Sequence, residues 1–326
     1  MTSPLSVGLP YFDAAAVRAA APWPTAVVAL ERALADGVDP ELDSPRLFSP
    51  APGGEFLIMP AQGLSTNGRS YSGVKALTVA PGNPARGLEK IQGIYLLIDS
   101  DTLAPLATMD CTELTAIRTP ATTLMAVKHI LAATPGGEAK HEPQVLVFGA
   151  GVQALNHLRA AHAVLPGARF AVVGQRPERV QTLIGTLAAE GIEVRAGGAA
   201  DVPEADVILC TTSSRTPLFD GGLVADGAVV AAVGQHGLDA REVDATLVLR
   251  SDVVVEGRAS AMREAGDLIP ARSVEEWEGI HPLNLRELVG GKLERTPGKP
   301  CLYAGVGMAW EDLVTAAVVY EGGTRE

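Results

Sequence analysis

Aromatic side chains, apolar runs of membrane-spanning length and an export signal are scarce or missing in this 326-residue sequence. Phe, Trp and Tyr make up 4% of the residues although hydrophobic residues reach 47%, so the buried cores must be built mainly from Ala, Val, Leu and Ile. No apolar run approaches the ~18 residues of a membrane span. The first residues, MTSPLS, lack the basic and apolar regions of an export signal. We therefore expect a cytoplasmic protein with no membrane partner.

Cysteine and positive charge are also low. Cys111, Cys210 and Cys301 are odd in number and widely spaced, which fits neither a disulfide framework nor a metal knuckle; we expect buried thiols and no metal site. The 26 basic residues against 38 acidic ones give a net charge of -12, which argues against a nucleic-acid partner. A small anionic ligand remains possible, because a few clustered cations can bind it.

The first third of the chain is rich in strand patterns. A helix interrupted near Pro22 and Pro24 resumes over 25–35, and the Pro- and Gly-rich stretch 36–54 is interpreted as loop. Turn-forming residues then separate four predicted strands, over 55–60, 71–79, 91–99 and 104–109. Successive strands without helices between them predict an antiparallel sheet.

After Met109 the pattern changes to alternating strands and helices. A helix is predicted over 119–133. The segments that follow are strands over 145–148, 170–173, 192–195, 206–210, 228–233 and 252–255, helices to about 165 and over 178–190, and a last helix over 307–320. This alternation predicts an α/β fold, a Rossmann-type doubly wound parallel sheet over 121–303, with a strand-rich α+β domain formed by 1–120 and 304–326.

A glycine-rich turn follows the apolar strand over 145–148. Gly149 permits a tight turn, Gly151 lets the backbone approach a pyrophosphate, and the small Ala154 lets the next helix lie against the strand. Together with Val152 and Gln153 they would place phosphates at a helix N-terminus, where N–H groups and the dipole favour anions. The alternative is a glycine turn of another α/β fold, such as a methyltransferase.

The end of the second strand bears on the cofactor. NAD-specific sheets usually carry an acid there for the ribose hydroxyls, whereas the strand over 170–173 runs into Gly174-Gln-Arg-Pro-Glu-Arg179 with no acid at that place. Arg176 and Arg179 would receive a 2′-phosphate, or they are solvated surface arginines. NADPH is therefore favoured, with NADH possible. Thr211 and Thr212, which follow the strand over 206–210, are further candidate cofactor contacts.

Eight short stretches, in order, resemble the ornithine cyclodeaminase/mu-crystallin family over nearly the whole chain. They are 44–47 (SPRL), 57–61 (LIMPA), 73–75 (GVK), 81–83 (PGN), 114–119 (LTAIRT), 149–154 (GAGVQA), 241–244 (REVD) and 311–313 (EDL). The resemblance implies a homodimer built through the strand-rich domain, a nicotinamide cofactor in the Rossmann domain and a substrate cleft between the domains. Family members include cyclodeaminases that turn ornithine into proline, cyclic imino acid reductases and amino-acid dehydrogenases.

Three basic residues, Arg46, Lys75 and Arg118, match family positions that bind the substrate carboxylate. Charge-assisted hydrogen bonds of this kind contribute ~1.5–3 kcal/mol each. Arg118 also precedes Thr119-Pro120, where Thr would cap a helix and Pro would take its first position, directing Arg118 and a helix N-terminus at one anion. For Arg46 the alternative is an exposed residue of a Pro-rich loop.

Two departures separate the sequence from the cyclodeaminases. Those enzymes carry Gly-Gly-Asp-x-Pro-Gly-Lys-x-Glu-Leu after the fifth Rossmann strand, where His236 stands at the position of the aspartate, and Leu57 replaces an acid before Met59-Pro60. A diamine substrate needs such acceptors, so the reductase branch is favoured. His236 or Lys75 would protonate the imine nitrogen, since imidazole titrates near neutral pH; alternatively His236 only lines the pocket.

These observations predict an NAD(P)H-dependent reductase of a cyclic ketimine carboxylate, such as Δ1-pyrroline-2-carboxylate or Δ1-piperideine-2-carboxylate. Ornithine cyclodeaminase and amino-acid dehydrogenase are alternatives within the same family. A crystallin-like protein that binds NADPH without turnover is an alternative of another class.

Overall fold

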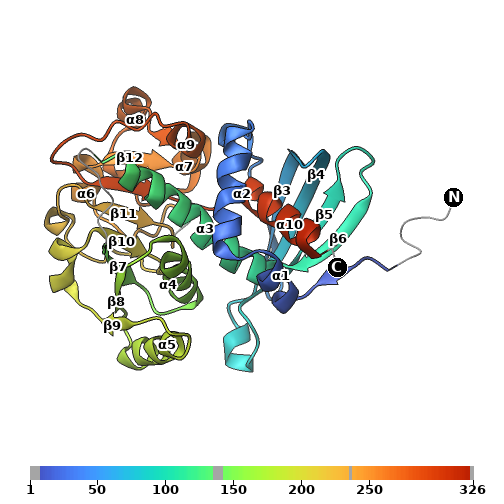
Figure 1. The fold of residues 1–326 in the computed structure, drawn as a ribbon, viewed down its shortest axis with the longest axis horizontal. Helices are drawn as coiled ribbons and strands as arrows, with labels where there is room; N and C mark the ends of the chain where they lie inside the picture. Colours follow the sequence, from blue (N-terminus) through green and yellow to red (C-terminus); the bar gives the residue numbers. More distant parts are fainter. Residues whose placement is uncertain (1–7, 135–141, 235–236, 324–326) are drawn as a thin grey trace. The chain divides into compact units, whose positions relative to one another are not determined.

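The computed structural model describes residues 8–134, 142–234 and 237–323. The chain divides into two units, one with the bounds Met1–Thr119 and Met308–Glu326 and the other with the bounds Pro120–Gly307. Each unit contains its own sheet (Figure 1). The mixed α/β class predicted from the sequence is confirmed.

The sheet of the first unit has six strands in the order β1-β6-β5-β4-β3-β2. Neighbours from β2 to β6 are antiparallel, as predicted, and β1 is parallel to β6. The strands are β1 Tyr11–Phe12, β2 Leu47–Ala51, β3 Gly54–Thr66, β4 Arg69–Val79, β5 Ile91–Asp99 and β6 Pro105–Asp110.

The interpretation of 36–54 as loop is wrong for β2. Leu47 pairs with Ile58 and Ala51 with Gly54, so β2 and β3 form a hairpin. Pro50 lies in this strand without disrupting the sheet because β2 is an edge strand, where a missing N–H is tolerated.

One face of this sheet is covered by helices. These are α1 Ala14–Ala20, α2 Trp23–Ala35 and α10 Ala309–Gly323; α10 contacts β3, β4 and β5 and packs against α1 and α2 (Figure 1). Because side chains alternate along a strand, Lys75 and Leu77 of β4 and Tyr95 of β5 point to this face and are buried. The other face is apolar but only partly buried, with Phe56 and Ile94 exposed.

Helix α3, Cys111–Ala132, begins eight residues before the predicted start. The Asp110 carboxylate accepts the N–H of Glu113 at 2.8 Å and so caps the helix in place of Thr119. Pro120 lies inside α3, where it costs about 3 kcal/mol, and the burial of residues such as Ile117 and Leu124 offsets this cost. The arrangement that placed Arg118 beside a helix N-terminus is therefore wrong.

The second unit contains an eight-stranded sheet in the order β13-β12-β14-β11-β10-β7-β8-β9, with parallel pairing throughout its described strands. The strands are β7 Gln144–Phe148, β8 Arg169–Val173, β9 Val194–Ala196, β10 Val207–Cys210, β11 Val229–Ala232, β12 Asp252–Val255, β13 Leu283–Asn284 and β14 Cys301–Ala304. The helices are α4 Val152–Val164, α5 Pro177–Ala189, α6 Ala245–Arg250, α7 Arg258–Glu264, α8 Val274–Ile280 and α9 Leu285–Val289. Strands β13 and β14 were not predicted.

The strand order reverses beside β7. The chain moves outward from β7 to β8 and β9, then returns to β10 on the other side of β7. In parallel sheets the crevice at such a reversal, outside the carboxyl ends of the strands, is where ligands bind. The Gly149 turn and Thr211 lie at these ends, and the Thr211 N–H donates to the carbonyl of Phe148 at 2.9 Å.

Short 3₁₀ turns complete the fold. They are η2 Pro40–Leu42, η3 Asn83–Arg86, η4 Ala199–Glu204, η5 Gly221–Leu223 and η6 Ile269–Ala271. The three cysteines are free and buried, as predicted. Among the described helices, none combines the length and the apolar character that crossing a membrane demands.

Candidate active site

Two of the three predicted carboxylate-binding cations meet in the first unit. Lys75 Nζ donates to Asp312 Oδ2 at 2.6 Å, and Arg118 donates through Nε to Asp312 Oδ1 at 3.2 Å and through Nη1 to Glu311 Oε2 at 2.9 Å. Lys75 is 2% exposed, Arg118 is 6% exposed, and both acids are fully buried. We refer to Lys75, Arg118, Glu311 and Asp312 as the buried ion-pair cluster. Such charges stay ionised in a protein interior only when they are paired.

The cluster is assembled at the N-terminus of α10. The Asp43 carboxylate accepts the backbone N–H of Ala309 at 2.9 Å and of Trp310 at 3.0 Å, so a residue from the other end of the chain caps the helix. Glu311 and Asp312 lie in the first turn, where the helix dipole favours negative charge. Capping therefore fixes both carboxylates opposite β4 and α3.

The Lys75 ammonium retains capacity for a ligand. Asp312 is its hydrogen-bond acceptor within the described parts of the chain, which leaves two of its three N–H donors unused there. Burial lowers the pKa of Lys75, the Asp312 carboxylate raises it and the Arg118 guanidinium lowers it further. A desolvated ammonium with unused donors is suited to bind an anion or to release a proton.

Apolar side chains flank Lys75 on the inner face of the sheet. Leu57 pairs with Leu77 across β3 and β4, one pair along from Met59 and Lys75 on the same face. Both leucines are buried. Leu57, at the position where the resemblance implies an acid in cyclodeaminases, thus presents hydrocarbon one pair along the face from Lys75.

Arg46 is half-buried and directly precedes β2. It follows Asp43 by three residues, so its segment begins at the capped N-terminus of α10. Arg46 thus lies in a loop, as its alternative interpretation had it, but is only partly exposed. His236, the other predicted catalytic residue, lies outside the described residues.

A cavity of about 480 Å³ occupies the crevice of the second unit. The residues that line it follow β7, β8 and β10: Phe148, Gly149, Ala150, Gly151, Val173, Gly174, Gln175, Arg176, Arg179, Thr211, Thr212, Ser213, Ser214, Thr216, Pro217 and Leu218. All the predicted cofactor contacts line this cavity except Val152, Gln153 and Ala154, which form the first turn of α4 directly after Gly151.

The glycine turn has the shape that a dinucleotide requires. Gly149 has a φ of +127°, and a Cβ there would lie 2.6 Å from Thr211 Oγ1, so a side chain is excluded. Gly151 caps α4 without a side chain, which keeps the first-turn N–H groups accessible to a phosphate. Ala154 is fully buried, consistent with close packing of the helix on the sheet. The residues present therefore fit a dinucleotide.

Arg176 and Arg179 stand at the start of α5 and both line this cavity. Both are exposed. No acidic side chain of the described chain lines the cavity, so the usual acceptor for the ribose hydroxyls is missing from its wall. Positive charge at this place suits a 2′-phosphate.

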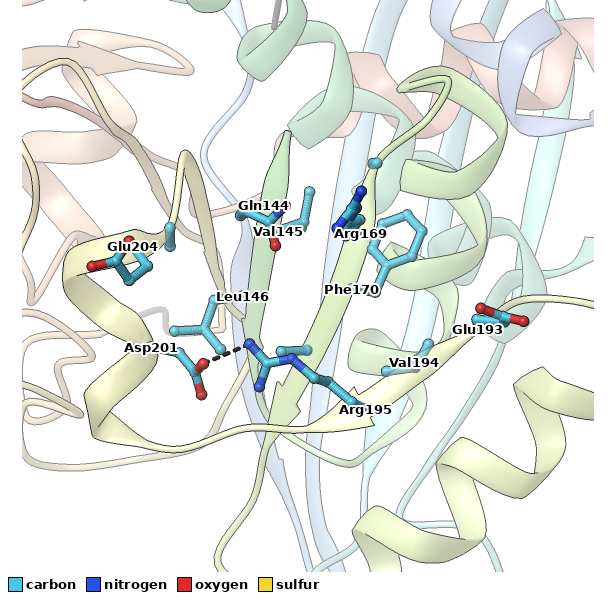
Figure 2. Close-up of a pocket in the computed structure, with 13 residues that line it drawn as sticks. Gln144, Val145, Leu146, Arg169, Phe170, Glu193, Val194, Arg195, Asp201 and Glu204 are labelled. Carbon is cyan, nitrogen blue, oxygen red and sulfur yellow. Dashed lines mark hydrogen bonds and ion pairs between the residues drawn. The ribbon is translucent and has the colours of Figure 1, made fainter. Parts of the chain in front are cut away.

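A second cavity in the same unit has a volume of about 520 Å³. Figure 2 shows the residues that line it. It is lined by the first residues of β7, β8 and β9 and by η4, and Arg195 Nη2 donates to Asp201 Oδ1 across it at 2.5 Å. This is the amino end of the strands, opposite to the end where parallel sheets bind ligands. Its size alone does not make it the cofactor site.

Comparison with known proteins identifies the family. The model of the ornithine cyclodeaminase/mu-crystallin family matches residues 26–325. The chain belongs to this family. A Δ1-pyrroline-2-carboxylate/Δ1-piperideine-2-carboxylate reductase of Azospirillum brasilense is 33% identical over 308 residues, which cover 94% of this chain and 93% of that protein. The family resemblance inferred from the eight stretches is confirmed.

Solved structures match this chain over nearly its whole length. Thermococcus litoralis Δ1-pyrroline-2-carboxylate reductase, in complex with NADH and L-proline, has a TM-score of 0.79 and 26% identity, and the match covers 97% of this chain and 98% of that one. A probable ornithine cyclodeaminase from Bordetella pertussis Tohama I has a TM-score of 0.82 and 26% identity, with 98% of each chain covered. The same fold is thus found in a Δ1-pyrroline-2-carboxylate reductase and in a probable ornithine cyclodeaminase.

Sequence reasoning assigned no role to Asp43, Glu311 or Asp312. A signal was present, because Glu311-Asp312 interrupts a final helix that is otherwise mostly apolar, and the stretch 311–313 matches the family. Two acids that a helix carries into a core require cationic partners.

Proposed function

We propose that this protein is an NAD(P)H-dependent reductase of a cyclic imino acid, with Δ1-pyrroline-2-carboxylate or Δ1-piperideine-2-carboxylate as substrate. The observation that carries the proposal is the buried ion-pair cluster, in which Lys75 has donors that no described residue accepts and shares a sheet face with Leu57 and Leu77. The activity named for the Azospirillum relative and the ligands of the Thermococcus structure support the same chemistry.

The cluster would bind the substrate carboxylate. Lys75 offers two N–H donors and Arg118 is held in a fixed orientation by two carboxylates, so neither cation must be reordered when the anion arrives. Preorganised donors in a site of low dielectric are more effective than donors in water. Arg46 would contribute a third cation. The hydrocarbon of Leu57 and Leu77 suits the methylene groups of the ring and offers no acceptor for a second amine.

The reaction needs a proton at the imine nitrogen, because a cationic imine accepts a hydride more readily. Burial lowers the pKa of Lys75, which makes its ammonium a stronger acid near neutral pH. Lys75 would therefore hold or donate this proton, and His236 is the second candidate. When bound, the reduced nicotinamide supplies the hydride for the imine carbon.

We propose NADPH as the preferred cofactor and expect the double substitution Arg176→Ser/Arg179→Ser to raise the KM for NADPH by about 10- to 100-fold. The estimate corresponds to one or two charge-assisted contacts with the 2′-phosphate, reduced by the exposure of both arginines. NADH lacks that phosphate, so its KM should change less than threefold. Steady-state kinetics with both cofactors measure the difference.

The matched control is Arg195→Ser, which removes an exposed arginine from the cavity at the other end of the same sheet. It should leave both KM values unchanged. Equal effects of the double substitution on NADH and NADPH would show that the two arginines do not recognise the 2′-phosphate.

The decisive experiment follows the absorbance of NADPH and NADH with Δ1-pyrroline-2-carboxylate, in parallel with ornithine plus NAD. We expect consumption of the reduced cofactor in the first reaction. Release of ammonia from ornithine without the first activity would establish a cyclodeaminase and overturn the proposal. Tight binding of NADPH with no turnover over a panel of cyclic imino acids and keto acids would favour the binding-protein alternative.

We also propose a homodimer formed through the uncovered face of the six-stranded sheet. Side chains on this face are apolar on three neighbouring strands: Phe56 and Ile58 of β3, Val74 and Ala76 of β4, and Ile94 and Leu96 of β5. A contiguous exposed apolar surface is typical of an interface. In a twofold dimer each residue of the surface occurs twice, so one substitution acts on both copies.

Ile94→Lys is therefore expected to convert the dimer into a monomer at micromolar concentration. Ile94 is 47% exposed at the centre of this face, and a lysine there places unpaired charge in an apolar interface, which costs several kcal/mol. Light scattering coupled to size-exclusion chromatography measures the mass. Val274→Lys, at an exposed apolar position of α8, is the control and should leave the mass unchanged. A monomeric wild-type protein would contradict the proposal.

We place the protein in the cytoplasm. Cys111, Cys210 and Cys301 are all free thiols in the interior, and such thiols are typical of proteins from reducing compartments.

A further inference from the structure

The stretch 241–244 contains a buried carboxylate that joins two loops of the second unit. Glu242 is fully buried. Its Oε1 accepts the N–H of Thr212 at 2.5 Å and the Thr212 hydroxyl at 2.8 Å, and its Oε2 accepts the N–H of Gly234 at 2.7 Å. Thr212 follows β10 and Gly234 follows β11, so one side chain ties together the loops that leave the carboxyl ends of two neighbouring strands.

The backbone around Glu242 adds further contacts to the same region. Its carbonyl accepts the N–H of Leu218 at 2.8 Å, and Asp267 Oδ1 accepts the N–H groups of Glu242 at 2.5 Å and Val243 at 3.0 Å. Thr212 and Leu218, both bonded to Glu242, line the dinucleotide cavity, whereas Glu242 lies behind its wall. The residue therefore acts on the cavity through its neighbours.

Gly234 shows how closely the two loops approach. A Cβ at this position would lie 2.2 Å from the Thr212 carbonyl oxygen and 2.7 Å from Glu242 Oε1. Backbone is packed on backbone here, with the carboxylate as the acceptor for both N–H groups. A loss of acceptor capacity on Glu242 must therefore displace one of the two loops.

We propose that Glu242 is a positioning residue whose carboxylate sets the shape of the dinucleotide cavity, and that its protonation weakens cofactor binding. The role rests on the proposed dinucleotide binding. A protonated carboxyl has one carbonyl oxygen and one hydroxyl donor, so it no longer accepts from both Thr212 and Gly234 with full strength. The loop that carries Thr212 into the cavity is then held less firmly.

The surroundings of Glu242 raise the pKa of its carboxyl group, so the group takes up a proton near neutral pH. Burial raises the pKa of Glu242 to about 7, against the opposing effect of the bonds from Thr212 and Gly234, and the Asp267 carboxylate raises it further. Two further titratable groups of the described chain interact with this pair: Cys210, whose thiol has a pKa well above its ordinary value because it is buried, and Arg241, which interacts with Asp267. Asp267 itself has a raised pKa because of burial.

Protonation of Glu242 should increase the stability of the fold while it weakens cofactor binding. A general loss of structure would decrease both, so the two measurements distinguish positioning from unfolding. The pKa is higher in the folded state than in the unfolded chain, so the folded state binds the proton more tightly. The stabilising contribution of this proton is fully present below the unfolded pKa near 4.3 and is lost as the pH rises through about 7. As the pH falls, this contribution to stability increases while cofactor affinity decreases.

The test is a titration of the full chain with NADH, followed by fluorescence, from about pH 8.5 to about pH 6. NADH is the probe because it lacks the 2′-phosphate of NADPH, whose own ionisation falls in this range. We expect the Kd of wild-type protein to increase about tenfold over this interval, the effect of about one lost hydrogen bond. Glu242→Gln should show the low-pH Kd at every pH, because an amide, like the protonated acid, has one acceptor oxygen.

Asp244→Asn is the matched control. Asp244 also ties a loop, since its carboxylate accepts the N–H groups of Leu247 at 2.8 Å and Gly221 at 3.0 Å, which are different partners from those of Glu242. This variant should lower the Tm and keep the pH dependence of NADH binding.

A pH-independent wild-type Kd, or a Glu242→Gln variant with the wild-type pH dependence, would overturn the role of Glu242 and leave the proposed function standing. A pH-independent wild-type Kd overturns this role even if the variant does not fold. Wild-type protein that binds neither NADH nor NADPH would overturn both.

Discussion

Arg118→Ala should lower kcat/KM for a cyclic ketimine carboxylate by about 10²–10³, the effect of one preorganised electrostatic contact. Arg118 is the guanidinium of the buried ion-pair cluster and is fixed by Asp312 and Glu311 before any substrate arrives. Its removal also takes the cation away from two buried carboxylates, which costs about 3–5 kcal/mol of stability. Steady-state kinetics and thermal unfolding are therefore measured together.

Two comparisons separate catalysis from folding in this experiment. Arg118→Lys keeps the charge and loses the planar fork, so it should retain more stability than Arg118→Ala but still lose activity. Arg18→Ala removes a mostly exposed arginine from an ion pair with Glu113 in the same unit and should change kcat/KM less than twofold. If Arg118→Ala kept wild-type kcat/KM, the cluster would not be the carboxylate site.

Lys75→Met should have the larger effect, a loss of about 10²–10⁴ in kcat/KM, the range for a positioned proton donor. Methionine fills a similar volume among Tyr95 and Met59, the cross-strand neighbours of Lys75, but provides neither charge nor proton. Wild-type activity should fall as the pH rises through the lowered pKa of Lys75, because the ammonium is then lost. The pH profile of Lys75→Met should lack this decrease in activity at high pH, which we call the alkaline limb.

Asp312→Asn tests whether the alkaline limb of the pH profile is due to the titration of Lys75. The Asp312 carboxylate raises the pKa of Lys75 against the effect of burial, so its neutralisation should shift the limb to lower pH and reduce kcat/KM by about 10- to 100-fold. The alkaline limb would belong to another group if Asp312→Asn showed it at the wild-type pH. The same conclusion would follow if it persisted in Lys75→Met.

The glycine turn of the proposed cofactor site follows from local sequence better than any other part of the molecule. The glycine turn is determined within ten residues: β7 is short and apolar, Gly149 requires a left-handed backbone and Ala154 must be small. The strand alternation after Met109 likewise predicted the parallel sheet, because buried strands between helices leave few other arrangements.

Helix α3 shows where local signals compete. Thr119-Pro120 has the pattern of a helix start, yet the helix already begins after Asp110, whose cap is equally good and whose position is favoured by burial of the residues that follow. Residues 111–118 contain no feature that excludes either start. Tertiary packing decides where the helix begins, and this packing cannot be inferred from a single sequence.

The ion pairs of the buried ion-pair cluster could not be predicted from the sequence, for a related reason. Lys75 and Arg118 were found through the resemblance, but their partners are 237 and 194 residues away along the chain. Helical or strand periodicity relates residues that are near in sequence and carries no information on such pairs. The acids in the final helix indicated only that some cation must face them.

The cap of α10 by Asp43 has a consequence for biosynthesis. The residues that neutralise Lys75 and Arg118 belong to α10, which follows every described strand of both sheets in the sequence, so the whole six-stranded sheet is synthesised before Asp43, Lys75 and Arg118 receive their partners. Until then the nascent first unit carries two cations without the acids that balance them in its interior. The second unit, continuous from Pro120 to Gly307, does not depend on α10 in this way, so the expected order of maturation is the reverse of the order in which the two units begin.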